Sequence, residues 1–308
     1  MSEDKKKFKA KGQVELLLDE VSEKDRNFDL GGRSFYFFDF DDNIIHLNTK
    51  IVLFHKRTNE EFLVPTTVYA ENLSKLGIAG SEWEHYEIRD LPGSNGSFRN
   101  FREQEELYLN KQEQPLVLDM LEGLSSGDVD WRGPSWEFFK HAVNSNRPIS
   151  IITARGHHPY TIKRAINILV QSQDLKLNPN YLSVYPVTHP DIRKVLGDDQ
   201  GDFSVGRLKK EAIKQAVWDA FRCYEFSEKH RFGMSDDDPN NLELIKEAMV
   251  ELKQKHPKNA FYVINTHKRD LIKEEVLLPG EQSSLGNKAN DTSSLGQVGL
   301  FPDDDISD

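Results

Sequence analysis

One stretch decides the fold: Phe35-Tyr36-Phe37-Phe38-Asp39-Phe40-Asp41-Asp42-Asn43, in which an aromatic run ends abruptly in three carboxylates. Four consecutive aromatic residues fit a strand that is buried on both faces of a parallel sheet. The aspartates then follow at the carboxyl end of that strand, where open α/β sheets place their sites. Clustered carboxylates repel one another unless a hard cation such as Mg²⁺ binds them. The competing interpretation is a strand followed by an ordinary polar turn, because Asp and Asn are common turn residues.

Two further segments repeat this pattern of an apolar run that ends in polar side chains. Residues 148–156 form a short apolar run that leads to Thr153 and a glycine turn at Gly156. Residues 231–240 form another strand-like run, which ends in acids. Helical stretches separate these runs, and such alternation predicts right-handed crossovers and a parallel sheet. We therefore expect a Rossmann-like three-layer α/β core with its polar strand ends at one edge.

Taken in order, the strand ends Asp39-x-Asp41, then Thr153, then Asp236-Asp237 resemble the motifs of the haloacid dehalogenase superfamily, phosphatase type. The resemblance covers residues 30–45 and 130–270, and it does not extend to the segment between them or to the termini. It implies a Mg²⁺-dependent phosphomonoester hydrolase that acts through an aspartyl-phosphate intermediate. The implied cofactor is Mg²⁺, and the expected substrate is a small phosphorylated metabolite. In this family, an insertion directly after the first acidic motif is called a cap.

The resemblance assigns the chemistry to the first motif. Asp39 matches the nucleophile, which accepts the phosphoryl group and so splits one displacement into two. Asp41 lies two residues on and returns to the same side of an extended chain. It matches the acid/base that protonates the leaving alcohol and then activates water. Asp42 alternates away, and we interpret it as structural.

The resemblance also implies a set of metal ligands. These are Asp39, the backbone carbonyl of Asp41, and Asp236. Asp39 and Asp236 are expected to face each other across adjacent strand ends, where Mg²⁺ with oxygen ligands relieves their repulsion. The secondary role falls to Asp237 or to Asn240, and the sequence leaves this choice open.

The remaining family positions bind the phosphoryl group. Thr153 is expected to donate its hydroxyl, and Ala154 its backbone N–H, to a phosphoryl oxygen. Taken alone, Thr153 fits better a residue that ends a strand and caps the next segment, and the ordered set of motifs favours the phosphate role instead. A lysine is expected to neutralise the nucleophile and phosphate as a point charge. Three lysines lie close together before the last motif, and the order of preference is Lys210, then Lys209, then Lys214.

The chain divides by pattern into a core, an insertion and two tails. The expected parts are an N-terminal tail and short helix (1–29), an HAD-like core (30–45 plus 131–275), an α+β cap insertion (46–130) and a disordered C-terminal tail (276–308). The insertion is too long for a connection within a compact domain. Within it we predict a hairpin (50–56 and 61–67), helical segments (70–76 and 97–109) and a further apolar stretch (117–124). In the core we predict helices at 134–144, 160–173, 208–221 and 241–255, and further strands at 182–187 and 261–265.

Composition limits the classes of partner. The chain has 308 residues and a net charge of −11, so it is a poor non-specific binder of nucleic acid or of an anionic membrane. Its one cysteine, Cys223, excludes an intrachain disulfide. The N-terminus lacks the apolar stretch of a signal peptide, and no run reaches the length of a membrane span. We expect a cytoplasmic protein whose partner is a small-molecule phosphate ester.

Other functions remain in competition with the metabolite phosphatase. One is a phosphatase that acts on polynucleotide ends. Another is a phospho-acceptor signalling module, since receiver domains also combine acidic pairs, a Thr and a Lys; however, the place of Thr153 along the chain does not fit their order. A third is a binding protein that kept the fold and lost turnover, although the presence of both Asp39 and Asp41 argues against it.

Side chains near the motifs receive weaker assignments. Adjacent histidines in a loop, such as His157 and His158, are expected to be exposed. Arg155 is equally compatible with a substrate contact and with a surface ion pair. Trp131 and Trp136 are expected to pack in the core rather than stack on a substrate.

Overall fold

The computed structural model describes residues 24–126, 130–267 and 271–283. Most of the predicted N-terminal part, with its short helix, and most of the predicted C-terminal tail lie outside these residues. Among the described helices, none combines the length and the apolar character needed to cross a membrane.

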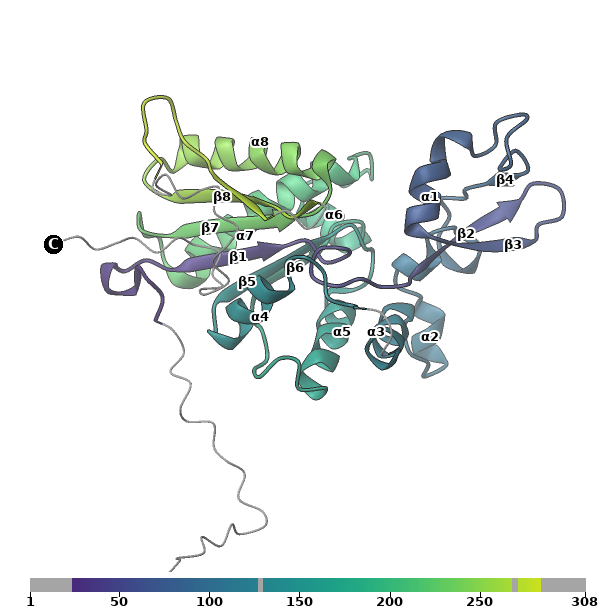
Figure 1. The fold of residues 1–308 in the computed structure, drawn as a ribbon, viewed down its shortest axis with the longest axis horizontal. Coiled ribbons are helices and arrows are strands. Elements are labelled where there is room, and N and C mark those ends of the chain that lie inside the picture. The colour runs from purple at the N-terminus through teal and green to yellow at the C-terminus, as the bar shows by residue number, and fades with distance from the viewer. Residues whose placement is uncertain (1–23, 127–129, 268–270, 284–308) are drawn as a thin grey trace, which may run out of the picture.

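A six-stranded sheet forms the centre of the molecule (Figure 1). Its strand order is β6-β5-β1-β7-β8-β9; the first five strands are parallel and β9 is antiparallel to β8. The strands are β1 (Ser34–Phe38), β5 (Pro148–Thr153), β6 (Asn180–Pro186), β7 (Arg231–Asp236), β8 (Ala260–Asn265) and β9 (Ile272–Glu275). The predicted α/β class with a mostly parallel sheet is confirmed, and the architecture is compatible with a Rossmann-like fold.

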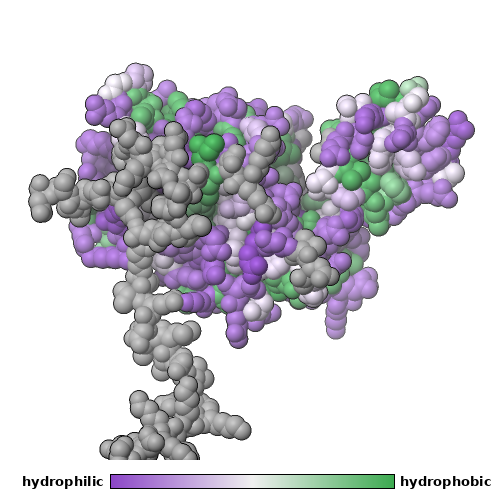
Figure 2. Space-filling model, viewed as in Figure 1, coloured by the Kyte–Doolittle hydropathy of each residue, from purple (hydrophilic) through white to green (hydrophobic). Residues whose placement is uncertain are grey.

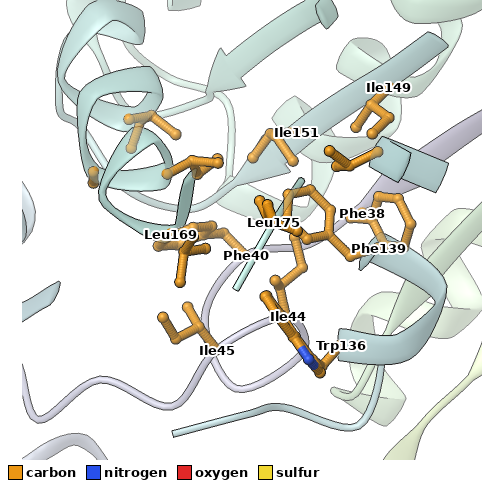
Figure 3. Close-up of a cluster of buried hydrophobic side chains, with 14 of the residues drawn as sticks. Phe38, Phe40, Ile44, Ile45, Trp136, Phe139, Ile149, Ile151, Leu169 and Leu175 are labelled. Carbon is orange, nitrogen blue, oxygen red and sulfur yellow. The ribbon is translucent and has the colours of Figure 1, made fainter. Parts of the chain in front are cut away.

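Helices cover both faces of this sheet (Figure 1). All five residues of β1 are buried, and their side chains alternate between the two faces as the period of a strand requires. Tyr36 and Phe38 join one apolar cluster with α4 (Trp136–Asn144) and α5 (Pro159–Gln171), part of which Figure 3 shows. Phe35 and Phe37 join a second cluster with α7 (Val205–Tyr224) and α8 (Pro239–Lys255). Helices cover β1 on both faces, so residues 35–38, which point to one face or the other, are all aromatic.

The predicted core helices are present with small shifts of their ends. They are α4 (Trp136–Asn144), α5 (Pro159–Gln171), α7 (Val205–Tyr224) and α8 (Pro239–Lys255), and a further short helix is α6 (Pro190–Val195). Their starts follow from local chemistry. The side chain of Ser204 accepts a hydrogen bond from the backbone N–H of Arg207 before α7, and that of Asp238 accepts from Asn240 before α8. Proline occupies the first turn of α5, α6 and α8, where its missing N–H is not needed.

A small lobe, residues 50–101, follows the first motif and has its own sheet. Its strand order is β3-β2-β4. The elements are β2 (Lys50–His55), β3 (Glu61–Pro65), α1 (Thr66–Asn72) and β4 (Tyr86–Glu87), joined by short 3-10 turns. The predicted hairpin is confirmed, because β2 and β3 pair in antiparallel register. Ile51, Leu53 and Val64 form a separate apolar cluster inside the lobe.

The predicted helix over residues 97–109 is wrong. The segment contains a 3-10 turn (Arg99–Phe101) and a short helix α2 (Glu105–Leu109), with extended chain between them. That extended chain pairs with the loop of the second motif: the backbone N–H of Gly156 donates to Phe101, and that of Glu103 donates to Gly156. Tertiary pairing of the backbone thus interrupts a segment that the pattern alone makes helical.

The last part of the predicted insertion packs with the main sheet. Helix α3 (Pro115–Ser125) places Leu116, Val117 and Met120 in the same apolar cluster as α4 and α5. Within the predicted insertion, the small lobe therefore has an apolar core of its own, whereas α3 shares the core of the main sheet.

Candidate active site

The carboxyl ends of three neighbouring strands bring the motifs together. In the parallel register, Phe38 of β1 lies between Ile151 of β5 and Ser235 of β7. The residues that follow each strand therefore emerge at one edge of the sheet. The backbone N–H of Asp39 donates to the carbonyl of Ser235 at 3.0 Å, so the ladder continues to the first motif aspartate.

A buried lysine joins the first and third motifs. Lys209 Nζ lies 2.9 Å from Asp39 Oδ1 and 3.0 Å from Asp236 Oδ2, and all three side chains are buried. Burial alone would lower the pKa of Lys209, but the carboxylates of Asp39 and Asp236 outweigh it and raise that pKa. The lysine therefore remains a cation between two carboxylates.

Lys209, and not Lys210 as the sequence analysis preferred, is the lysine that lies beside Asp39. Lys210 turns outward from α7 and pairs with Glu247 and Glu251 of α8, and Lys214 pairs with Glu211 and Glu251. Consecutive helical residues point about 100° apart, so only one of two adjacent lysines can face the sheet. Lys209 shares the buried face of α7 with Ile213 and Ala216, four and seven positions later. That spacing was the available signal.

Three carboxylates form a compact acidic cluster. Asp39, Asp236 and Asp237 each offer an oxygen, and these oxygens lie within 4.8 Å of one another. Burial raises the pKa of Asp39 well above its usual range; Lys209 opposes this, and Asp236 and Asp41 add to it. Burial and the neighbouring charges of Asp236 and Asp42 raise the pKa of Asp237 to about 7. Burial therefore disfavours the ionised form of both carboxyl groups, and the neighbouring carboxylates add to this.

Asp237 and Asn240, between which the sequence leaves the secondary metal role open, lie in different surroundings. Asp237 lies in the carboxylate cluster, whereas the side chain of Asn240 donates to Asp238 in the first turn of α8. The oxygens of Asp236 are held in place, since Oδ1 accepts from the backbone of Asp238 and from the side chain of Asn241.

Asp41, the second aspartate of the first motif, is held by an arginine. The guanidinium of Arg155, 1% exposed, binds the carboxylate of Asp41 through Nε at 2.9 Å and Nη2 at 2.6 Å. Nη2 also donates to Thr49 Oγ1 at 2.9 Å, and Thr49 in turn donates to Asp119. Of the two roles open to Arg155, a surface ion pair is thus excluded by burial. A chain of hydrogen bonds runs from Asp41 into the segment after the first motif.

Thr153 and Ala154 lie where the sequence places them, beside the first motif. Thr153 Oγ1 donates to Asp41 Oδ2 at 3.3 Å, a long contact, and accepts from the backbone N–H of Arg155. Ala154 is exposed, and its carbonyl accepts from Thr188. A Cβ at Gly156 would lie 2.8 Å from Thr188 Oγ1, so the turn after the second motif needs a glycine for close approach.

Asn43 holds the strand ends together, a role that the sequence did not reveal. Its side-chain N–H groups donate to the carbonyls of Asp39 and Ser235 and to Ser235 Oγ. Its Oδ1 accepts from Ser135 and Thr266. The fully buried amide thereby links β1, β7, the start of α4 and the end of β8. Since an Asn after two acids reads as a turn residue, only the tertiary structure identifies it.

The other assignments divide. Asp42 has a left-handed backbone (φ 56°) and its side chain contacts the partly exposed His46, as expected of a structural residue. Trp131 and Trp136 are buried against each other in the core, as predicted.

The expectation that His157 is exposed is wrong, because it is fully buried, and burial lowers its pKa well below its usual value. His158 is exposed and accepts from the backbone at the start of α5.

A pocket of about 370 Å³ opens beside Asp41. The main sheet contributes Asp41, Ala154 and Arg155 to its walls, and the small lobe contributes Ile51 and Phe98. The small lobe therefore lies over the same edge of the sheet as the motif residues. Figure 1 shows this lobe beyond the tip of β1.

Comparison with known proteins does not assign the chain. No protein-family model matches the sequence, and no curated protein or solved structure matches it significantly. The function therefore rests on the geometry of the site.

Proposed function

We propose that this protein is a Mg²⁺-dependent phosphomonoester hydrolase of the haloacid dehalogenase type, acting through an aspartyl-phosphate. The observation that carries the proposal is the buried triad of Asp39, Lys209 and Asp236 at the carboxyl ends of two adjacent parallel strands. A nucleophilic carboxylate, a fixed cation and a further carboxylate are what in-line phosphoryl transfer needs from a protein. The order of these residues along the chain agrees with the motif resemblance.

The proposed reaction has two displacements. In the first, a carboxylate oxygen of Asp39 bonds to phosphorus, the ester P–O bond breaks, and Asp41 gives its proton to the leaving oxygen. In the second, Asp41 takes a proton from water, the water oxygen bonds to phosphorus, and the P–O bond to Asp39 breaks, which frees inorganic phosphate and restores the Asp39 carboxylate. Lys209 offsets negative charge beside the nucleophile in both steps. The hydroxyl of Thr153 and the backbone N–H of Ala154 orient the phosphoryl oxygens.

Arg155 is a positioning residue in this scheme. Its Nε and Nη2 groups make three hydrogen bonds that hold the carboxylate of Asp41 in the wall of the pocket, where the leaving group would lie in this scheme. A planar guanidinium binds a carboxylate through two parallel N–H groups, so it restricts direction as well as distance.

The residues present fit a hard divalent cation. The donors of Asp39, Asp236 and Asp237 are all carboxylate oxygens, the ligands that Mg²⁺ prefers. Burial raises the pKa values of Asp39 and Asp237, and a bound divalent cation would oppose both shifts. When bound, Mg²⁺ would keep these carboxylates ionised and offset charge on the phosphoryl oxygens. In the family resemblance, the small lobe corresponds to the cap.

Turnover should depend on Mg²⁺ and on Asp236. We expect hydrolysis of para-nitrophenyl phosphate with Mg²⁺, and its loss in excess chelator. Asp236→Asn should raise the Mg²⁺ concentration for half-maximal activity by at least about tenfold, the loss that even an outer partner of a metal site commonly causes. Calorimetric titration with Mg²⁺ alone should show the same weakening without any substrate.

The matched control is Asp238→Asn. Asp238 lies two residues on, outside the carboxylate cluster, and Asn serves equally well at the start of a helix. This variant should bind Mg²⁺ like the wild type. Full activity of the wild type in excess chelator would refute the metal-assisted scheme.

The proton transfer assigned to Asp41 should depend on the leaving group. Asp41→Asn should lower kcat/KM for phenyl phosphate by about a hundredfold or more, the usual contribution of general acid catalysis. The loss should be much smaller for para-nitrophenyl phosphate, whose leaving group needs little protonation. Both esters carry one ring, so their fit to the pocket is similar. Equal losses for the two would contradict the general-acid role.

A further inference from the structure

The pocket beside Asp41 indicates which part of a substrate it receives. Pockets for small organic ligands usually measure about 300–1,000 Å³, and this one, at about 370 Å³, lies near the lower end. Asp41, the proposed proton donor to the leaving oxygen, forms part of its wall. A phosphoryl group at the strand ends would therefore direct its leaving group into this pocket. This inference rests on the proposed function.

The exposed surface inside the pocket is mainly apolar. Ile51, Phe98 and Phe101 of the small lobe and Val205 at the start of α7 line it. Figure 2 shows hydrophobic side chains on the side of the lobe that faces the main body. Polar residues also line the pocket, but Asp41 is paired with Arg155 and Asp90 with Arg102. A sugar would lose water from several hydroxyl groups on entering and would have to compete with these ion pairs for hydrogen bonds. A polyhydroxylated leaving group therefore fits this pocket poorly.

Two arginines accompany the aromatic rings. The guanidinium carbon of Arg155 lies 4.9 Å from the ring centre of Phe101, and that of Arg102 lies 5.9 Å from the ring centre of Phe98. Arg155 Nη1 is buried and has no hydrogen-bond partner among the described residues. Flat guanidinium groups and phenylalanine rings both pack well on aromatic faces.

We infer that the natural substrate is a small phosphate monoester whose leaving group carries one aromatic or heteroaromatic ring system. The ring lies among Ile51, Phe98 and Phe101, and the ester oxygen lies at the Asp41 end. Selection comes from the small lobe, while the bond-breaking residues come from the main sheet.

The preference for a ring can be tested with three esters: benzyl phosphate, hexyl phosphate and glucose 6-phosphate. Each has a primary alcohol as its leaving group, so the three differ mainly in what would occupy the pocket. Their affinities for the full-length Asp39→Asn protein are measured by calorimetry in the presence of Mg²⁺. Benzyl phosphate should bind at least about tenfold more tightly than glucose 6-phosphate, the discrimination that an apolar pocket commonly achieves. Hexyl phosphate should fall between them. Equal affinity for hexyl and benzyl phosphate would overturn the aromatic assignment, and equal or tighter binding of glucose 6-phosphate would overturn the inference altogether.

Two variants locate the effect. Phe98→Leu and Phe101→Leu, each made in the Asp39→Asn background, keep apolar volume but remove a ring; each should weaken benzyl phosphate binding severalfold and leave glucose 6-phosphate unchanged. The control is Phe62→Leu, since Phe62 lies on the same small sheet, is 47% exposed and does not line the pocket. Circular dichroism verifies that each variant folds. Unchanged benzyl phosphate affinity in both folded pocket variants would overturn the inference.

The outcomes also separate this inference from the proposed function. If wild-type protein hydrolyses none of the three esters while the preference for benzyl phosphate remains, the hydrolase proposal fails and the pocket assignment stands. If it hydrolyses all three and binding shows no preference, the hydrolase proposal stands and the pocket assignment fails.

Discussion

Asp39→Asn should abolish turnover while leaving the fold intact. Removing the nucleophile of a covalent mechanism commonly lowers kcat by at least about three orders of magnitude. In the wild type, Lys209 Nζ lies 2.9 Å from Asp39 Oδ1. The amide oxygen of the asparagine can accept a hydrogen bond from the same lysine. Burial raises the pKa of Asp39, so a neutral side chain at this position should not lower the melting temperature in Mg²⁺-free buffer. Initial rates with para-nitrophenyl phosphate and a thermal melt check the two expectations.

Asp42→Asn provides the control for this experiment. Asp42 lies three residues along, and Asn tolerates its left-handed backbone as well as Asp does. Its activity should stay within about twofold of the wild type, since surface substitutions seldom have large effects. An Asp39→Asn protein that retains activity within about tenfold of the wild type would contradict the nucleophile assignment.

Lys209→Met should cause the second-largest loss. The substitution removes the cation between Asp39 and Asp236 but keeps a long apolar stem of similar length in the buried space. Loss of one fixed charge that stabilises a transition state commonly lowers kcat by about a hundredfold to a thousandfold. The melting temperature in Mg²⁺-free buffer should also fall, because two buried carboxylates lose their compensating charge.

The neighbouring lysine is a matched control within the same helix. Lys210→Met removes ion pairs to Glu247 and Glu251 at the surface of α7 and α8. Pairs of this kind are worth at most about 1 kcal/mol, so stability should change little and kcat should be unaffected. If Lys210→Met inactivates the protein and Lys209→Met does not, the observed geometry does not represent the working site.

The small lobe and the motif loops are directly connected. Phe101 and Glu103 pair with the backbone of Gly156, and Thr49 receives a hydrogen bond from Arg155. Asp41, which Arg155 holds, therefore depends for its position on segments from both parts of the chain. Substrate selection by the lobe and proton transfer at Asp41 are expected to be coupled through Arg155.

Regular elements were predictable where the apolar period was strong. The aromatic run of β1 and the apolar stripes of α5, α7 and α8 are local signals, and the structure reproduces these elements within a few residues. Prediction failed for residues 97–109, where pairing with Gly156 interrupts the helix, and for His157, which the fold buries. The first of these depends on a residue more than fifty positions away, and the second depends on how the fold covers the loop.

The sequence by itself determined the α/β class, the position of acidic residues at two strand ends, and the presence of an insertion after the first motif. These follow from periods of two and 3.6 residues, which the local chain expresses on its own. Only the tertiary structure decided that Lys209 bridges Asp39 and Asp236, that Arg155 holds Asp41, and that the small lobe closes a pocket with the strand ends. The reason is physical: each of these contacts joins residues far apart in the chain, and their distance is set by strand register and helix packing, which no local pattern encodes.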